Sequence, residues 1–314
     1  MRLLLSAPLL GLAWFAASNA IASAGAWGAA RFAIRRRGTL DDQGAALFLR
    51  LFPAAFAAVF VLGIFLPAHL RLEPADSDES FGPLLVGLAA IAVVLLARSL
   101  WRGAAIAAIA ARTARLLRAA ERTGDIYNVP DHHGISLAGV FRTRILVGAH
   151  ARRILTPAEL ALAIAHERAH RRAYDNLKRC AIACAPDFFG GTRTARALEQ
   201  QWHAQAECAA DARAAAGNAT RARRLASALV KVARSRVRQA SAVHSPVWST
   251  FHDAPLLEAR VRRLVSGGSH MAVRQPRKPV RAVSLAATAL AGLWYAGVPV
   301  YVHRITEAVV SALP

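Results

Sequence analysis

Four apolar stretches constrain the fold of this 314-residue chain more than any other feature. Each has about the 20 residues that an α-helix needs to cross the hydrocarbon core of a bilayer. The stretches are Leu3 to Ala24, Leu51 to Leu70, Phe81 to Trp101 and Val283 to Val302. The hydrophobic content of 55% and the mean hydropathy of +0.31 are high for a soluble protein. We therefore expect four transmembrane helices.

The first stretch also resembles a secretory signal peptide, with Ala22-Ser23-Ala24 as a possible cleavage site. Its basic N-terminal region consists of Arg2 alone, and three further apolar stretches follow. We expect the segment to be retained as a span, and we keep cleavage as the alternative.

The distribution of arginine predicts the orientation. The formal net charge is +21, and nearly all of it comes from arginine. Arginines fill the loop between the first two stretches and flank both ends of the segment 102–282, whereas the loop after the second stretch is acidic. By the positive-inside rule, the first loop and the segment 102–282 are cytoplasmic and both termini face outward. Arginines that concentrate beside apolar stretches also argue against a nucleic-acid-binding protein.

The pentapeptide His166-Glu167-Arg168-Ala169-His170 predicts a zinc site in this cytoplasmic segment. Residues four apart share one face of a helix, so His166 and His170 can bind one zinc ion. Glu167 can then act as the general base toward a zinc-activated water. Thr156-Pro157-Ala158-Glu159 predicts the start of that helix, with Thr156 as N-cap and Glu159 completing a capping box.

A catalytic zinc site usually has three protein ligands, and three residues compete for the third place. Glu207 lies in Glu207-Cys208-Ala209-Ala210-Asp211, while His203 and Glu199 precede it at intervals of one helical turn. Asp211 could accept the remaining N–H of a ligand histidine. Spacing alone leaves the choice between Glu207, His203 and Glu199 open.

Two other groups of metal-binding residue types have simpler explanations. Cys180 and Cys184 lie four residues apart and could bind a metal, but buried small apolar residues are the commoner explanation. His132-His133 lies in a Pro-Asp-His-His-Gly sequence that predicts a surface turn. With Cys208 the cysteines are odd in number, so we expect reduced thiols.

The remaining segments predict a mainly helical domain. Residues 102–123 continue the third stretch as a basic helix, and residues 124–150, rich in glycine around short apolar runs, predict a small strand or hairpin unit. Four further helical stretches follow the zinc motif, over 176–186, 193–217, 219–240 and 254–264.

Several motifs together resemble one family. Ala165 to Leu177 resembles the extended zinc motif of the BlaR/MecR family of integral-membrane metallopeptidases, and Leu155 to Leu160 resembles the start of its zinc helix. Glu207-x-x-x-Asp211 is similar to an element of that family and, more distantly, of the Ste-type and HtpX membrane proteases. Residues 251–260 resemble a segment that these proteins carry after the ligand helix. The resemblance covers 135–265 by motif and the whole chain by topology.

The resemblance implies a gluzincin-like domain that holds one zinc ion through His166, His170 and Glu207. It implies Glu167 as the catalytic base, with Asp211 and Asp175 as carboxylates that support the ligands. It further implies regulated cleavage of a protein substrate, for example a cytoplasmic repressor, at the bacterial inner membrane. The alternative is a non-proteolytic membrane signalling or scaffold protein with a structural or degenerate zinc site.

One departure from the family bears on the signal. The antibiotic-sensing members carry an extracellular penicillin-binding domain after the last span, whereas only Tyr301 to Pro314 follow here. We therefore do not expect this chain to be acylated by a β-lactam.

The sequence thus predicts a mainly α-helical membrane protein with four transmembrane helices and a cytoplasmic gluzincin-like domain carrying a small β unit. The expected segments are a three-span region over 1–101, a basic juxtamembrane helix over 102–123, the metallopeptidase domain over 124–265, a basic linker over 266–282, the fourth span over 283–302 and a short outer tail over 303–314.

Overall fold

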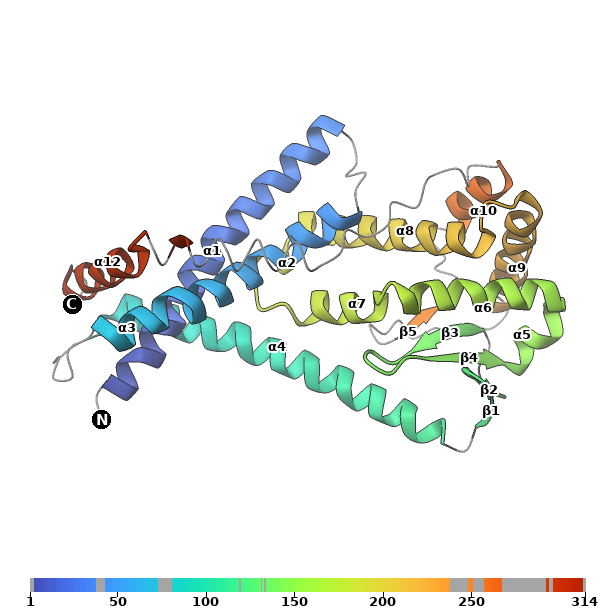
Figure 1. Cartoon of the computed structure of the whole chain (residues 1–314), viewed down its shortest axis with the longest axis horizontal. Helices are drawn as coiled ribbons and strands as arrows, with labels where there is room; N and C mark the ends of the chain where they lie inside the picture. The colour runs from blue at the N-terminus through green and yellow to red at the C-terminus, as the bar shows by residue number, and fades with distance from the viewer. Residues whose placement is uncertain are drawn as a thin grey trace. The chain divides into compact units, whose positions relative to one another are not determined.

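The computed structural model describes residues 3–37, 43–72, 81–118, 120–130, 132, 134–237, 248–250, 257–266, 292–293 and 296–312. Most of these residues are helical, and one small sheet accompanies the helices (Figure 1). The chain divides into two compact units. The first comprises Met1–Leu100, Ala185–Glu199 and Gln275–Pro314, and the second comprises Trp101–Cys184 and Gln200–Arg274.

Long apolar helices dominate the first unit. They are α1 (Leu3–Arg37), α2 (Gln43–Phe60) with the π-helix η1 (Val61–Phe65) and α3 (Leu66–Leu72), and the first part of α4 (Pro83–Leu116). Three segments are long and apolar enough to cross a membrane: Ser6–Arg36, Gln43–Leu72 and Pro83–Leu116. The first three predicted spans are therefore confirmed as apolar helices of sufficient length. The helix α1 continues without a break through Ala22-Ser23-Ala24.

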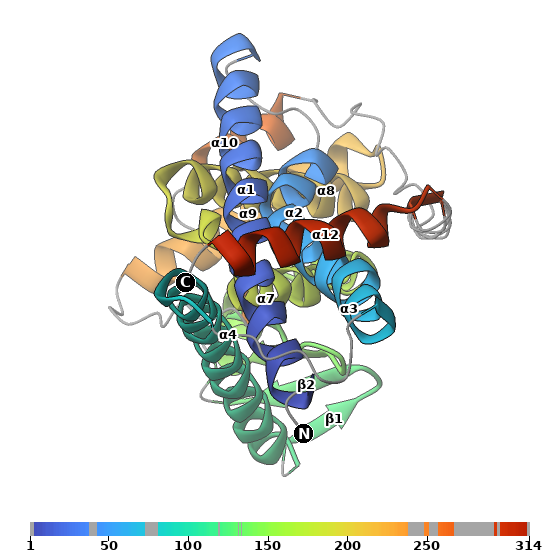
Figure 2. The same cartoon turned by 90° about the vertical axis from the view of Figure 1, so that its left-hand side faces the viewer.

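The fourth predicted span, 283–302, lies mostly outside the described residues, as does the linker over 266–282. The described helix α12 (Val298–Ala312) begins inside the predicted span and continues through most of the predicted tail. It packs against η1 and α3 (Figure 2), and Thr306 accepts a hydrogen bond from Trp14 Nε1 at 3.0 Å. The expected boundary between a span and a tail at residue 302 is therefore not a helix end.

A buried ion pair lies inside the first unit. Arg50 of α2 is 3% exposed, and its guanidinium contacts Asp187 at 2.8 Å and Glu199 at 2.5 Å. The carbonyl oxygen of Asp187 also accepts a hydrogen bond from Arg98. Because buried charges are costly unless they are paired, these contacts fix the segment 185–199 to the apolar helices of this unit.

The helix α4 extends beyond the third span, as predicted, but it ends at Leu116 instead of at residue 123. Residues Glu121–Thr123 form strand β1, which turns at Gly124 into β2 (Ile126–Val129). Gly124 has φ +65°, a conformation that glycine adopts far more readily than other residues. Because residues 121–123 pair with β2 as a strand, the basic helix cannot continue to residue 123.

The predicted β unit is a five-stranded mixed sheet in the order β1-β2-β4-β3-β5. The expected hairpin is formed by β3 (Ile135–Ala138) and β4 (Arg144–Gly148), which pair antiparallel, while β2 and β4 pair parallel. The edge strand β5 (Trp248–Thr250) pairs antiparallel with β3. No strand was expected at the position of β5.

The helices of the second unit match the predicted stretches within a few residues where these are described, except the short α5, which was not predicted. They are α5 (Ala149–Ile154), α6 (Pro157–Arg172), α7 (Asp175–Cys184), α8 (Arg193–Ala215, which starts in the first unit after η2, Phe189–Gly191), α9 (Ala219–Val237) and α10 (Leu257–Val265). The helix α6 packs over β3 and β4 and faces α8 on another side (Figure 1). Apolar side chains of β3, β4, α6 and α9 form the main core, which includes Leu137, Ile145, Leu162, Leu225 and Leu229.

The start of α6 has the predicted capping box. The hydroxyl of Thr156 accepts a hydrogen bond from the backbone N–H of Glu159, and the carboxylate of Glu159 accepts one from the backbone N–H of Thr156 at 2.9 Å. Ser227 and Lys231 of α9 also donate to this carboxylate, each at 2.7 Å. Burial would raise the pKa of Glu159, but these hydrogen bonds outweigh it and lower the pKa to about 2.

This network predicts a pH-dependent contribution to stability. Glu159→Gln should lower the free energy of unfolding by about 1–2 kcal/mol at neutral pH, because it removes the carboxylate from the cap and from Lys231. The folded pKa of about 2 lies below the ordinary value of 4.5, so the contribution is complete above pH 4.5 and disappears as the pH falls toward 2. Chemical unfolding in detergent, followed by circular dichroism across pH, measures it. Glu258→Gln, which removes an exposed pair with Arg262, is the control and should change little; equal effects of the two substitutions would contradict the prediction.

Candidate metal centre

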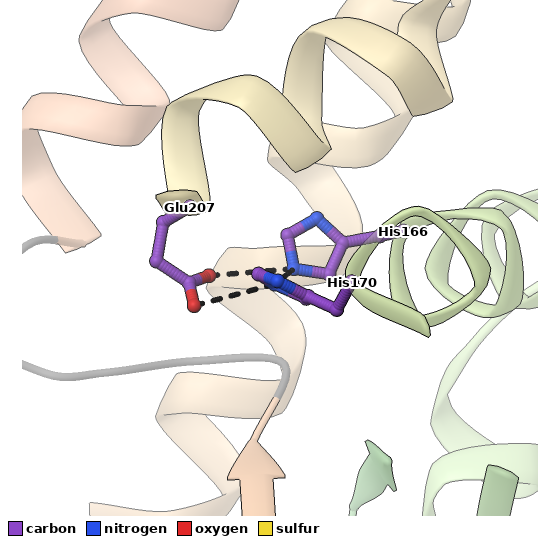
Figure 3. A group of neighbouring side chains, drawn as sticks. All are labelled: His166, His170 and Glu207. Atoms are coloured by element: carbon purple, nitrogen blue, oxygen red, sulfur yellow. Dashed lines mark hydrogen bonds and ion pairs between the residues drawn. The ribbon is translucent and has the colours of Figure 1, made fainter. Parts of the chain in front are cut away.

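Three buried side chains from two helices meet in the second unit. His166 and His170 of α6 and Glu207 of α8 point toward one another (Figure 3), and each is at most 1% exposed. The helix α6 places both imidazoles on one face because they are four residues apart. The carboxylate of Glu207 approaches this face from α8. Of the competing candidates for the third place, the structure brings Glu207 to the histidines.

The spacing of the donor atoms suits one metal ion. The two Nε2 atoms are 3.0 Å apart, and each lies 3.3 Å from an oxygen of Glu207. A tetrahedral ion with bonds of about 2.0–2.1 Å needs ligand atoms about 3.3 Å from one another. Among the residues that the structure describes, this is the one group of three or more histidine, cysteine or carboxylate side chains with such spacing. The group could therefore hold a metal ion.

Each histidine has its own carboxylate partner on the opposite ring nitrogen. Nδ1 of His166 lies 2.9 Å from Asp211, and Nδ1 of His170 lies 2.8 Å from Asp175. A carboxylate at Nδ1 favours the proton there and leaves the Nε2 lone pair facing the centre of the group. Asp211 and Asp175 thus lie where carboxylates that orient the ligands should lie.

Two buried arginines complete the group, and neither was expected there from the sequence. The guanidinium of Arg260, from α10, donates to Asp211 at 2.7 and 2.8 Å and contacts Glu207 at 2.9 Å. Arg179, from α7, contacts the other oxygen of Glu207 at 3.3 Å. A sequence signal for Arg260 existed, because it lies on the same helical face as Leu257, Val261 and Leu264. A charge on an otherwise apolar face needs a buried partner.

The buried group is short of positive charge when the imidazoles are neutral. Glu167, Asp175, Glu207 and Asp211 are all buried, against the two buried guanidiniums of Arg179 and Arg260. Burial would lower the pKa of His170, but Glu207 and Asp175 outweigh it and raise the pKa to about 10. Burial would also lower the pKa of His166, but Asp211 and Glu207 outweigh it and raise this pKa. Burial would raise the pKa of Glu207, but His170 and Arg260 outweigh it and lower this pKa. A divalent cation between the donor atoms would supply the missing charge without these protons.

Glu167 differs from the other carboxylates of the group. It is fully buried, and neither of its oxygens has a hydrogen-bond partner among the described residues. Burial raises its pKa to about 7, although His166 and His170 act in the opposite direction. Because a buried polar group without a partner costs stability, a carboxylate in this position needs a reason beyond packing.

The competing metal candidates have other contacts. Glu199 pairs with Arg50, so it is not the third ligand. His203 contacts the ring of Trp202 with centroids 4.8 Å apart and does not belong to the group. His132 lies within hydrogen-bond distance of Ser136, while His133 is outside the described residues. Cys180 and Cys184 contact each other, and burial raises the pKa of Cys180 to about 11, which disfavours the thiolate that a metal needs.

The chain matches no protein-family model, and no curated protein matches it either. The family resemblance therefore depends on the motifs of the sequence, and the chemistry of the site depends on its own geometry.

The role of Arg260 in charge balance leads to a stability prediction. Arg260→Gln should lower the free energy of unfolding of the metal-free protein by about 3–5 kcal/mol, because Asp211 and Glu207 keep their buried charges and lose their partner. Arg262→Gln on the same helix is the matched control, since its side chain is 78% exposed and, among the described residues, pairs only with exposed Glu258. It should change the free energy of unfolding by no more than about 0.5 kcal/mol. Denaturant unfolding in detergent compares the two, and a loss below about 1 kcal/mol for Arg260→Gln would show that the group does not need this charge.

Proposed function

We propose that this chain is an integral-membrane zinc endopeptidase that uses His166, His170 and Glu207 as metal ligands and Glu167 as general base. The observation that carries the proposal is the carboxylate of Glu167. It is buried and has no partner among the described residues, and it directly follows a histidine of the metal group. A purely structural zinc site has no use for such a group.

The donor set favours zinc. Two imidazoles and one carboxylate are the ligands of a class of catalytic zinc sites that leave the fourth position open. Zinc, when bound there, supplies Lewis acidity that activates water and polarises a peptide carbonyl. The carboxylates at both Nδ1 atoms keep the imidazoles in the tautomer that ligation requires.

Glu167 then moves the protons of the reaction. Its carboxylate oxygen accepts a proton from the water as the water oxygen forms a bond to the peptide carbon. When the bond between that carbon and the amide nitrogen breaks, Glu167 returns the proton to the leaving amine. The products are a carboxylic acid, which releases its remaining proton to solvent, and an amine, and Glu167 ends the cycle in its starting form.

Arg179 is the best-placed group to stabilise the negative charge that develops on the carbonyl oxygen. It is 9% exposed, contacts Glu207 through one nitrogen, and leaves its Nε without a partner among the described residues. Arg260 is less suited, because it donates to Asp211 through two nitrogens and contacts Glu207 through the third. A preorganised buried donor stabilises such charge far more than one in water.

We also propose a membrane topology, a cellular location and a substrate class. Four spans, with the metal domain in the cytoplasm of a bacterium and the chain in its inner membrane, are supported by the three apolar helices and by the arginine distribution. The resemblance to the BlaR/MecR family supports regulated cleavage of a protein substrate, for example a cytoplasmic repressor.

Glu167→Gln tests the proposed chemistry. The variant should keep about one zinc ion per chain, measured by elemental mass spectrometry, because the substitution leaves all three ligands in place. Proteolysis should fall by about 10²-fold or more, because the proton acceptor is lost. Proteomics of cells carrying the wild type or the variant finds the substrates, and purified protein with candidate substrates measures the rate.

His166→Ala is the companion control and should lose both zinc and proteolysis. Unchanged proteolysis in Glu167→Gln would refute the role of this residue. Wild-type protein that binds zinc and cleaves nothing would instead favour a membrane scaffold with a structural metal site.

Arg179→Gln tests the proposed stabilising donor. At saturating zinc, kcat should fall by about 10²–10³-fold with little change in KM, because the donor acts on the transition state. Arg153→Gln on α5, which changes an exposed arginine, should leave both constants unchanged. If Arg179 serves only to balance the charge of Glu207, its loss will change the affinity for zinc while kcat at saturating zinc stays the same.

A further inference from the structure

A cavity of about 410 Å³ adjoins the metal group within the second unit. The turn between β3 and β4 forms one wall, and the turn between α6 and α7 forms another. The cavity is lined by His170, which is one of the three candidate metal ligands, and by Asp175, whose carboxylate lies 2.8 Å from Nδ1 of His170. A ligand in this cavity would therefore lie beside the His170–Asp175 pair, at the edge of the candidate metal site.

The cavity carries uncompensated positive charge. Three arginines line it: Arg142, Arg171 and Arg172. Arg171 is paired with Asp125 at 2.9 Å, and the lining carboxylate of Asp175 already contacts His170 and Lys178. The guanidiniums of Arg142 and Arg172 are exposed and form no ion pair or hydrogen bond with the described residues. Among the described residues, the cavity thus has two guanidiniums without a partner and no unpaired carboxylate.

The two walls of the cavity are held together by hydrogen bonds that do not involve the candidate metal ligands. The side-chain amide of Asn176 donates to the carbonyl oxygens of Leu137 and Gly139, at 3.0 and 2.8 Å, and so ties α7 to the β3–β4 turn. Tyr174 has φ +55°, which is strained for an aromatic residue. Tyr174 lines the cavity and is 69% exposed. Phe141 also lines the cavity and is 86% exposed. The cavity therefore combines fixed walls, two aromatic rings and two cationic groups.

We propose that this cavity is a substrate subsite that binds a carboxylate close to the scissile bond, so that the enzyme prefers acidic peptide substrates. Guanidiniums pair with carboxylates through charge-assisted hydrogen bonds, and aromatic rings pack against the adjoining peptide. The carboxylate comes either from an Asp or Glu side chain or from the C-terminus of the peptide. This inference rests on the proposed function for its meaning, but the binding itself can be measured without cleavage.

Peptide binding to the full-length Glu167→Gln protein in neutral detergent tests the subsite. Three fluorescent peptide pools with randomised flanks are compared by anisotropy at low salt: a central Glu with an amidated C-terminus, a central Gln with an amidated C-terminus, and a central Gln with a free C-terminus. We expect the Glu pool or the free C-terminus pool to bind about tenfold more tightly than the amidated Gln pool. The pool that gains shows which carboxylate the cavity takes.

The double variant Arg142→Gln/Arg172→Gln, also made in the Glu167→Gln background, should bind all three pools alike. Arg224→Gln is the matched control, because it removes an exposed arginine of α9 outside the cavity, and it should keep the preference. The preference should also weaken as salt is raised, since both guanidiniums are exposed. Equal zinc content and circular dichroism spectra show that the variants are folded.

Two results would overturn the subsite: equal binding of all three pools, or a preference that survives the double variant. A different pattern is expected if the protein binds these peptides but is not a peptidase. In that case the carboxylate preference and its loss in the double variant remain, while wild-type protein cleaves none of the pools.

Discussion

The charge balance of the buried metal group is the constraint on which the second unit depends. Four carboxylates and two imidazoles are withdrawn from water between α6, α7, α8 and α10. Carboxylates are almost never buried without partners. Arg260 and Arg179 supply part of the compensation, so the α10 and α7 helices are needed chemically as well as for packing. Among the described residues, the arrangement has one place, between the two Nε2 atoms and Glu207, where a cation could complete the balance.

The sequence predicted α6 well because the information is local. The capping box at Thr156 and Glu159 sets where the helix starts, and the four-residue spacing sets which face the histidines share. Both rules act within a few residues of the chain, so tertiary context has little chance to override them. The three apolar helices were predictable for the same reason, since length and hydropathy suffice.

The third ligand was not predictable from spacing. Glu199, His203, Glu207 and Asp211 follow one another at intervals of four along α8, and each step rotates the side chain by only about 40° around the axis. Neighbouring members of such a row look equivalent in sequence. What separates them is tertiary: Glu199 is engaged by Arg50, whereas Glu207 and Asp211 meet His166 and Arg260. The partners of these residues come from segments that lie far away in the sequence.

The parts that the sequence missed share this dependence on distant contacts. Strand β5 has only three residues and acquires its conformation from pairing with β3, more than a hundred residues earlier in the chain. Arg179 and Arg260 receive their roles only when α7 and α10 dock beside Glu207. The early end of α4 depends on the pairing of β1 with β2, which begins as a turn at one glycine.

The isolation of Glu167 gives the strongest reason to interpret the group as catalytic. Asp175 and Asp211, which only need to orient histidines, each have short contacts to a ring nitrogen and to a cationic side chain. The same elements provide no such partner to Glu167, although it lies on α6 beside His166. A fold selected for stability alone would replace this residue with an apolar one, because an unpaired buried carboxylate is more costly than a packed hydrocarbon side chain. A carboxylate whose hydrogen-bonding capacity is left unused in the protein is free to accept a proton from a water molecule and to release it to a leaving group.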